Sequence, residues 1–162
     1  MKPIGFAREE VDKLKFSTKG RYGLRAMIDL AVYSNGEYVT LASIAERQGI
    51  STNYLEQVFS ALRKSGLVKS AKGAQGGYVL SESPSDIKVG RILRVLEGPL
   101  SVTDEDDENL AGNESCIRNC IRINVWEKMN NSLNELVDSV TLEDLAEDYR
   151  KRNGIDNSMY YI

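Results

Sequence analysis

The sequence predicts a mainly α-helical fold with one small β-hairpin, and residues 41–81 carry three observations that support this. Apolar residues recur with helical spacing in two neighbouring stretches, the first after Thr40 and the second after Ser51. Each of these hydroxyls can accept a hydrogen bond from a free amide at a helix start, so both residues are expected to be helix caps. A glycine-rich stretch between two short apolar runs follows, which is typical of a hairpin.

The second of these helices is expected to have one buried face and one polar face. Leu55, Val58, Phe59 and Leu62 recur at i, i+3, i+4 and i+7, which is the spacing of a buried stripe. The opposite face has short polar groups near its start and cations further along, a composition typical of a recognition helix that enters the major groove of DNA. The polar face comprises Thr52, Asn53, Glu56, Gln57, Ser60, Arg63 and Lys64.

The hairpin is predicted at 67–81, with short strands at 67–71 and 78–81. Glycines in the loop permit positive φ, while Lys69 and Lys72 add positive charge. A helix-turn-helix followed by a basic hairpin is a winged helix, whose hairpin reaches phosphate or the minor groove of DNA. One alternative is a three-helix packing unit with an ordinary hairpin, and another is a protein–protein interaction module whose hairpin and helix bind no DNA. Only DNA binding would weaken steeply with salt, because it depends on phosphate contacts.

Charge is distributed unevenly along the 162-residue chain, whose formal net charge is −3. Residues 1–80 contain 12 lysines and arginines against 7 acidic residues, whereas residues 81–162 contain 9 against 17. A basic N-terminal half and an acidic remainder fit a domain that faces DNA.

Enzyme activity is not expected, because the chain contains no histidine and no phosphate-binding loop motif. The missing histidine also removes the commonest metal ligand. No apolar run approaches the ~18 residues that span a bilayer, and no signal-peptide core follows Met1. A cytoplasmic protein without membrane contact is therefore predicted.

A long helix is expected to begin at Ser17, with Lys19, Arg21, Tyr22 and Arg25 crowded into its first turns. A helix N-terminus favours anions, so these cations could bind phosphate. They could equally be a solvated face, and both interpretations remain open.

The C-terminal half predicts a second part of the molecule. A helix that ends at Gly98 is followed by an acidic run at 104–108, which is expected to be a mobile loop. A helix over roughly 117–139 would then span roughly 35 Å, longer than a small core requires, so we interpret it as a dimerisation helix. Its apolar stripe comprises Ile121, Val125, Met129, Leu133, Leu136 and Val140. Thr141 is expected to cap a last helix.

The sequence resembles the Rrf2 family of bacterial winged-helix transcription regulators from about residue 16 to the end. The motifs that carry the resemblance are STKGRYG at 17–23, YLEQ at 54–57, LRKSGLV at 62–68, Gly73 with GGY at 76–78, and TLEDL at 141–145. The resemblance implies that Tyr22, Ser51, Glu56 and the wing contact operator DNA. It also implies that the long C-terminal helix forms a homodimer.

These patterns and the resemblance together define the candidate sites and the domain organisation. The candidate DNA-contacting residues are Lys19, Arg21, Tyr22, Ser51, Thr52, Asn53, Tyr54, Glu56, Gln57, Lys64, Lys72, Gly73, Gln75 and Gly76. The expected parts are an N-terminal extension (1–15), a winged helix-turn-helix domain (16–100, with the helix-turn-helix at 41–64 and the wing at 67–81), an acidic loop (101–115), dimerisation helices (116–153) and a C-terminal tail (154–162).

Two branches of the family match the C-terminal half differently. Iron–sulfur members carry three cysteines and a further ligand, often histidine, before the dimer helix. Here only Cys116 and Cys120 lie in that region, and Ile123 takes the place of the histidine, so a cluster would need ligands from elsewhere. The segments 95–99 and 158–162 resemble instead the CymR-type branch, which represses cysteine and sulfur metabolism genes in complex with cysteine synthase and without a bound cofactor. A repressor of this kind is predicted, with a cluster-based or thiol-based redox regulator as the alternative.

The two cysteines are redox candidates on other grounds as well. Four residues apart on a helix, their Cβ atoms would be roughly 5–6 Å apart, too far for an unstrained disulfide. An expected cap at Ser115 would place Cys116 at the positive end of the helix, which favours the thiolate. Ordinary apolar packing of both cysteines is the alternative.

Overall fold

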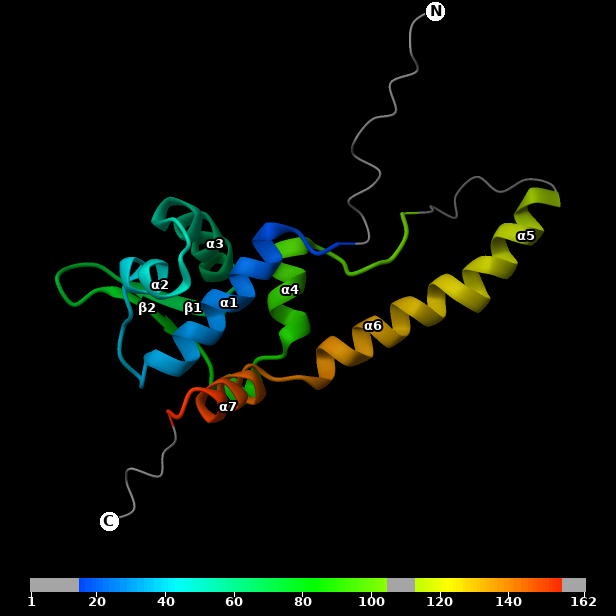
Figure 1. Ribbon diagram of the computed structural model, residues 1–162. Helices are drawn as coiled ribbons and strands as arrows, with labels where there is room; N and C mark the ends of the chain where they lie inside the picture. The colour runs from blue at the N-terminus through cyan, green and yellow to red at the C-terminus, as the bar shows by residue number, and fades with distance from the viewer. Residues whose placement is uncertain (1–14, 105–112, 156–162) are drawn as a thin grey trace, which may run out of the picture.

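The structure is a computed structural model that describes residues 15–104 and 113–155 (Figure 1). Its elements are α1 (Thr18–Tyr33), α2 (Leu41–Gln48), α3 (Thr52–Lys64), β1 (Val68–Ala71), β2 (Gly77–Leu80), the 3₁₀ turn η1 (Pro84–Asp86), α4 (Val89–Glu97), α5 (Asn113–Ile121), the π-helical segment η3 (Arg122–Trp126), α6 (Glu127–Ser139) and α7 (Leu142–Arg152). The predicted mainly α-helical fold with a two-stranded hairpin is confirmed. The expected N-terminal extension up to Leu14, the acidic run beyond Asp104 and the tail beyond Ile155 lie outside the described residues.

Local sequence signals place the first helices where they were expected. The Ser17 side chain caps α1, and the Thr40 and Ser51 hydroxyls accept from the third amide beyond them at 3.2 Å. Gly49 then ends α2 in the left-handed conformation, with φ +64°. This turn lets α3 follow α2 directly.

The core lies between α1, α3, α4 and α7. The predicted stripe of α3 is buried, and Phe59 contacts Tyr78 of the hairpin with ring centroids 4.9 Å apart. Fully buried side chains of the core include Met27, Leu30, Ile44, Leu55, Phe59, Leu62, Leu67, Ile87, Ile92 and Leu142. We call this unit, α1 to α4 with the hairpin and α7, the body.

The hairpin is joined to the body by backbone hydrogen bonds. Its strands run antiparallel with Val68 opposite Leu80. The first strand begins one residue later than predicted, and the second begins and ends one residue earlier. Val39, two residues before α2, exchanges two hydrogen bonds with Tyr78, at 2.7 and 2.8 Å. Gly77 makes this approach possible, because a Cβ there would lie 2.3 Å from the Val39 carbonyl oxygen.

Residues 113–139 form one long helical arm that leaves the body (Figure 1). We call α5, η3 and α6 together the rod. It ends at Ser139 as predicted, but it begins at Asn113. The prediction that Ser115 caps this helix is therefore wrong, because the helix already includes that residue.

Two members of the predicted apolar stripe do not face outward from the rod. Leu133 and Val140 are half-buried and pack with Val89, Leu93 and Val137 at the junction with α4. The remaining stripe residues are exposed, as is Ile117. The chain then returns to the body through α7, which Thr141 and Asp144 begin with a reciprocal capping box. None of the described helices is long and apolar enough to span a membrane.

Candidate nucleic-acid interface

The polar face of α3 is exposed apart from Ser60, which is half-buried. Thr52, Asn53, Glu56, Gln57, Arg63 and Lys64 are all exposed. Ser51 is exposed too, but its hydroxyl already accepts the Tyr54 amide, so its cap role is observed directly. The face therefore presents amide, hydroxyl and carboxylate groups near the start of the helix and two cations at its end.

Tyr54 lies elsewhere, although it belongs to the same predicted set. It is half-buried against Tyr22 of α1, with ring centroids 5.9 Å apart and an edge-to-face angle of 81°. Burial, followed by the nearby Tyr22 and Glu97, raises the pKa of the Tyr54 phenol above its ordinary value. Tyr54 thus joins α3 to α1 and does not contribute to the exposed face.

Tyr22 is the centre of a small aromatic and cationic cluster at the start of α1. The Arg25 and Arg21 guanidinium groups lie 5.1 and 5.9 Å from its ring centroid. Arg25 also donates to the carbonyl of Gln48, at the C-terminal end of α2. Of the cations predicted here, Arg21 is exposed and Lys19 half-buried. Both interpretations of these residues, phosphate contact and solvated face, are compatible with this arrangement.

A buried ion pair holds α2 in place against α1. Asp29 is only 2% exposed, and its carboxylate accepts two hydrogen bonds from Arg47, at 2.7 and 2.9 Å, and one from Gln48, at 2.9 Å. The hydrogen bond to Asp29 raises the pKa of Arg47, whose guanidinium also lies 4.3 Å from the ring centroid of Tyr33. This pair was not predicted, although an acidic residue between Ile28 and Leu30 on an apolar helix face was a usable signal.

The tip of the hairpin exposes side chains on a tightly turned backbone. Lys72 and Gln75 are exposed, whereas Gly76 is buried and donates to the Gly73 carbonyl at 3.0 Å. Gly73 has φ +104°, and a Cβ on Gly76 would lie 2.4 Å from the Ala71 carbonyl oxygen. The two glycines therefore shape the loop, and Lys72 and Gln75 are the side chains that it offers to a partner.

The structure brings the hairpin and the helix-turn-helix together at two places. The tip residues 74–76 line a shallow recess with Glu37, Tyr38 and Thr40, so the tip lies beside the start of α2. At the other end, Arg63 of α3 donates to the Ser70 hydroxyl of β1 at 3.4 Å. The exposed face of α3 and the hairpin thus belong to one surface.

Cys116 and Cys120 lie far from this surface, on α5 (Figure 1). Both are exposed free thiols, and the Asn124 side-chain amide donates to the Cys120 carbonyl at 2.8 Å and lies 3.8 Å from its Sγ. Among the residues that the structure describes, no three His, Cys, Asp or Glu side chains form a group that could hold a metal. Two thiolates are half of an ordinary iron–sulfur ligand set, so these residues alone do not fit a cluster.

Comparisons with protein families, with known sequences and with solved structures agree with one another. Residues 16–148 match the Rrf2 family, described as iron-dependent transcriptional regulators. CymR of Bacillus subtilis strain 168, an HTH-type transcriptional regulator, is 46% identical over 134 residues, which cover 82% of this chain and 90% of that protein. The solved structure of CymR (YrzC), the global cysteine regulator of B. subtilis, superposes with a TM-score of 0.71 at 45% identity, covering 83% of this chain and 97% of the other. The solved structure of T. potens IscR superposes with a TM-score of 0.69 at 47% identity, covering 91% of this chain and 97% of the other.

The protein has a winged helix-turn-helix with an exposed polar recognition helix. Together with these matches, this fold defines the protein as a DNA-binding transcription regulator. The chain belongs to the Rrf2 family of transcriptional regulators. The predicted family and fold are confirmed.

Proposed function

We propose that the protein is a homodimeric, cytoplasmic repressor of cysteine and sulfur metabolism genes, and not an enzyme. The observation that carries the proposal is the likeness to the global cysteine regulator of B. subtilis, which extends over 97% of that chain at 45% identity. A repressor of this class acts by occupying operator DNA and excluding other proteins from the promoter.

The exposed groups divide into two kinds of DNA contact. Thr52, Asn53, Glu56 and Gln57 of α3 carry the hydrogen-bonding groups that read base edges in the major groove. The cations act on phosphates, which fix position and supply most of the salt-dependent affinity. The proposed phosphate contacts are Lys19, Arg21, Lys64 and Lys72, with Tyr22, Ser51, Tyr54, Gly73, Gln75 and Gly76 shaping or flanking the surface.

The rod supports the homodimer. Ile117, Ile121, Val125, Met129 and Leu136 are all exposed, between 40% and 67%, and they follow one another along the rod. A continuous apolar stripe of this length marks an interaction surface. A second copy presents the same stripe, so two rods can cover each other around a twofold axis.

The experiment that tests the proposal starts from the purified protein and a random DNA library. Sequences selected by binding should recur upstream of cysteine and sulfur metabolism genes, and affinity for them should fall steeply with salt. Binding without salt dependence would contradict the DNA interface. Selected sites that lie elsewhere in the genome would contradict the assigned genes but leave the DNA-binding regulator intact.

The cysteine synthase partner implied by the resemblance has no support from the relatives' names or from the described residues. It stays a prediction, which co-purification of the protein with added cysteine synthase tests directly. Formation of a complex only with the intact full chain would support the predicted partner. If no complex forms at micromolar concentrations, the prediction is wrong.

A second candidate is redox regulation through Cys116 and Cys120, favoured by the exposure of both thiols and by the likeness to T. potens IscR. Anaerobic purification tests the cluster form, since a cluster absorbs near ~400 nm. Peroxide tests the thiol form: operator binding should fall in the parent and persist in Cys116→Ser. If Cys116→Ser and Cys120→Ser lose binding as the parent does, the thiols are not the switch.

A further inference from the structure

The junction between the rod and the body combines an apolar contact with a set of directional hydrogen bonds. The apolar part is Val137 of α6, buried against Val89 and Leu93 of α4. Apolar packing between two helices tolerates a scatter of about 15–20° in crossing angle. This contact alone therefore holds the rod to the body without fixing its direction.

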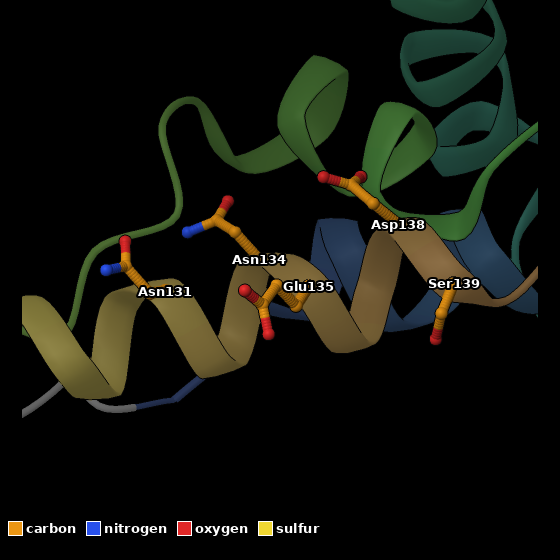
Figure 2. A pocket seen from close by; sticks show the side chains of 5 residues that line it. All are labelled: Asn131, Asn134, Glu135, Asp138 and Ser139. Atoms are coloured by element: carbon orange, nitrogen blue, oxygen red, sulfur yellow. The ribbon is translucent and has the colours of Figure 1, made fainter.

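The hydrogen bonds of Arg94 on α4 fix the direction of the rod relative to the body. Its guanidinium donates to both carboxylate oxygens of Asp138, at 2.7 and 2.8 Å, and to the side-chain oxygen of Asn134 at 2.7 Å. Figure 2 shows Asn134 and Asp138 on α6, with Asp138 reaching toward the neighbouring α4. A planar guanidinium that makes three bonds to two residues one helical turn apart accepts only a narrow range of orientations.

The same face of α6 continues the pattern away from the body. Asn130 lies four residues before Asn134, so both amides point to the same side of the helix. Asn130 accepts from the Val102 amide at 2.8 Å, and Asn134 donates to the Leu100 carbonyl at 3.2 Å. The segment that leaves α4 is thereby bonded to the rod at two positions one helical turn apart.

Gly90 provides the space for this arrangement. A Cβ on Gly90 would lie 2.1 Å from the Asp138 Oδ1 atom and 2.8 Å from the Arg94 Nη1 atom. The carboxylate can therefore reach over α4 only because this position has no side chain. The hydrogen bonds from Arg94 also lower the pKa of Asp138, so the carboxylate stays ionised well below neutral pH.

We infer that Arg94, Asn130, Asn134 and Asp138 form a positioning junction, which sets the direction of the rod and so the separation of the two recognition helices in a dimer. This rests on the proposed homodimer. A body of this size has a radius of gyration of about 13 Å, so its far side lies roughly 25 Å from the junction, and a tilt of roughly 10° moves that side by about 4 Å. That displacement is comparable with the ~3.4 Å rise of one base pair. The junction therefore determines which half-site spacing the protein accepts.

A matched control is available one helical turn away on the same helix. Arg91 also bonds both carboxylate oxygens of one acidic residue, since its Nη1 donates to Glu82 at 2.7 and 2.9 Å, and its side chain is 41% exposed against 35% for Arg94. The Arg91 pair lies entirely within the body. Arg91→Gln removes an equivalent ion pair without touching the rod.

The experiment measures the distance between the two bodies of the dimer by pulsed electron spin resonance. A spin label is placed at Glu46→Cys on α2, with Cys116→Ser and Cys120→Ser as background, after the dimeric mass is verified. The parent and Arg91→Gln should give one narrow distance distribution. Arg94→Gln and the near-isosteric Asp138→Asn should give distributions about twofold broader, because the two-oxygen ion pair between α4 and α6 is lost, and the apolar packing and the remaining hydrogen bonds to the 100–102 segment restrict the angle less.

Operator spacing provides the functional readout. The parent should bind a selected operator more tightly than the same operator lengthened by one base pair. In Arg94→Gln this loss of affinity should be smaller by about fivefold or more, whereas Arg91→Gln should lose as much affinity as the parent. A dimer with unchanged distance widths and unchanged spacing preference in both junction variants would overturn the inference alone. A monomeric parent would overturn the proposed dimer, and the inference with it.

Discussion

At the scale of single residues, Glu56 is the clearest candidate for reading a base. It is exposed on α3 one turn beyond the Ser51 cap, and a carboxylate can accept from cytosine N4. Glu56→Ala should weaken discrimination at one base pair by about 1–3 kcal/mol while affinity for random DNA stays equal or rises, because a negative charge is lost. Fluorescence anisotropy on operator variants measures both quantities. Glu147→Ala on α7 removes the same charge far from α3 and should change neither; equal losses on operator and random DNA would refute the base contact.

The second prediction at this scale concerns Asp29 and the stability of the folded protein. Asp29→Ala leaves the Arg47 guanidinium without its partner, and the free energy of unfolding should fall by about 2–3 kcal/mol. The loss stays below that of a fully buried charge because the Arg47 side chain is 31% exposed. Urea denaturation measures it. Asp148→Ala breaks the exposed i,i+4 pair with Arg152 and should cost far less. Similar losses in the two variants would show that Asp29 does not hold α2.

At the scale of elements, the hairpin is expected to contribute one phosphate contact through Lys72. Lys72→Ala should lower DNA affinity and reduce the slope of log K against log salt by about one. The side chain is exposed beside Gly73, so its loss disturbs no packing. Lys151→Ala on α7 is the matched control and should leave the slope unchanged. An unchanged slope in Lys72→Ala would mean that the hairpin stays clear of DNA.

The elements that could be predicted are those that local signals determine. The caps at Thr40, Ser51 and Thr141 and the turn at Gly49 act within a few residues, so sequence spacing reveals them. The bridge between Val39 and Tyr78 could not be predicted, because it joins backbone groups 39 residues apart and leaves no side-chain pattern.

The residues of the candidate site could likewise be predicted only where local sequence patterns determine their positions. Exposure of Glu56, Gln57 and Lys72 follows from helical and turn patterns, and the structure agrees. The inward position of Tyr54 depends on Tyr22, which approaches from another helix, so periodicity within α3 cannot show it. The junction around Arg94 was missed for the same reason, since it joins two helices whose crossing no local signal determines.

At the scale of the whole molecule, the π-helical segment keeps the exposed stripe of the rod on one side. Ile117, Ile121, Val125 and Met129 follow one another at intervals of four residues. In an α-helix each such step drifts by about 40° around the axis. The segment η3 has more residues per turn and lies in the middle of this series, so it removes part of the drift. The stripe therefore runs along the rod rather than winding around it, as an extended contact with a second rod requires.

The homodimer should accordingly depend on the stripe and not on the rest of the rod. Leu136 is 62% exposed within the stripe, and Leu136→Glu places a charge where the second copy would exclude water. The variant should be monomeric by light scattering, and operator affinity should fall by about 100-fold, since the two half-sites are no longer bound together. Asn131→Glu adds the same charge to an exposed position of α6 outside the stripe and should remain a tight dimer. Should Leu136→Glu stay dimeric at micromolar concentration, the two copies would have to associate through another surface, and the rod would have to serve a different partner.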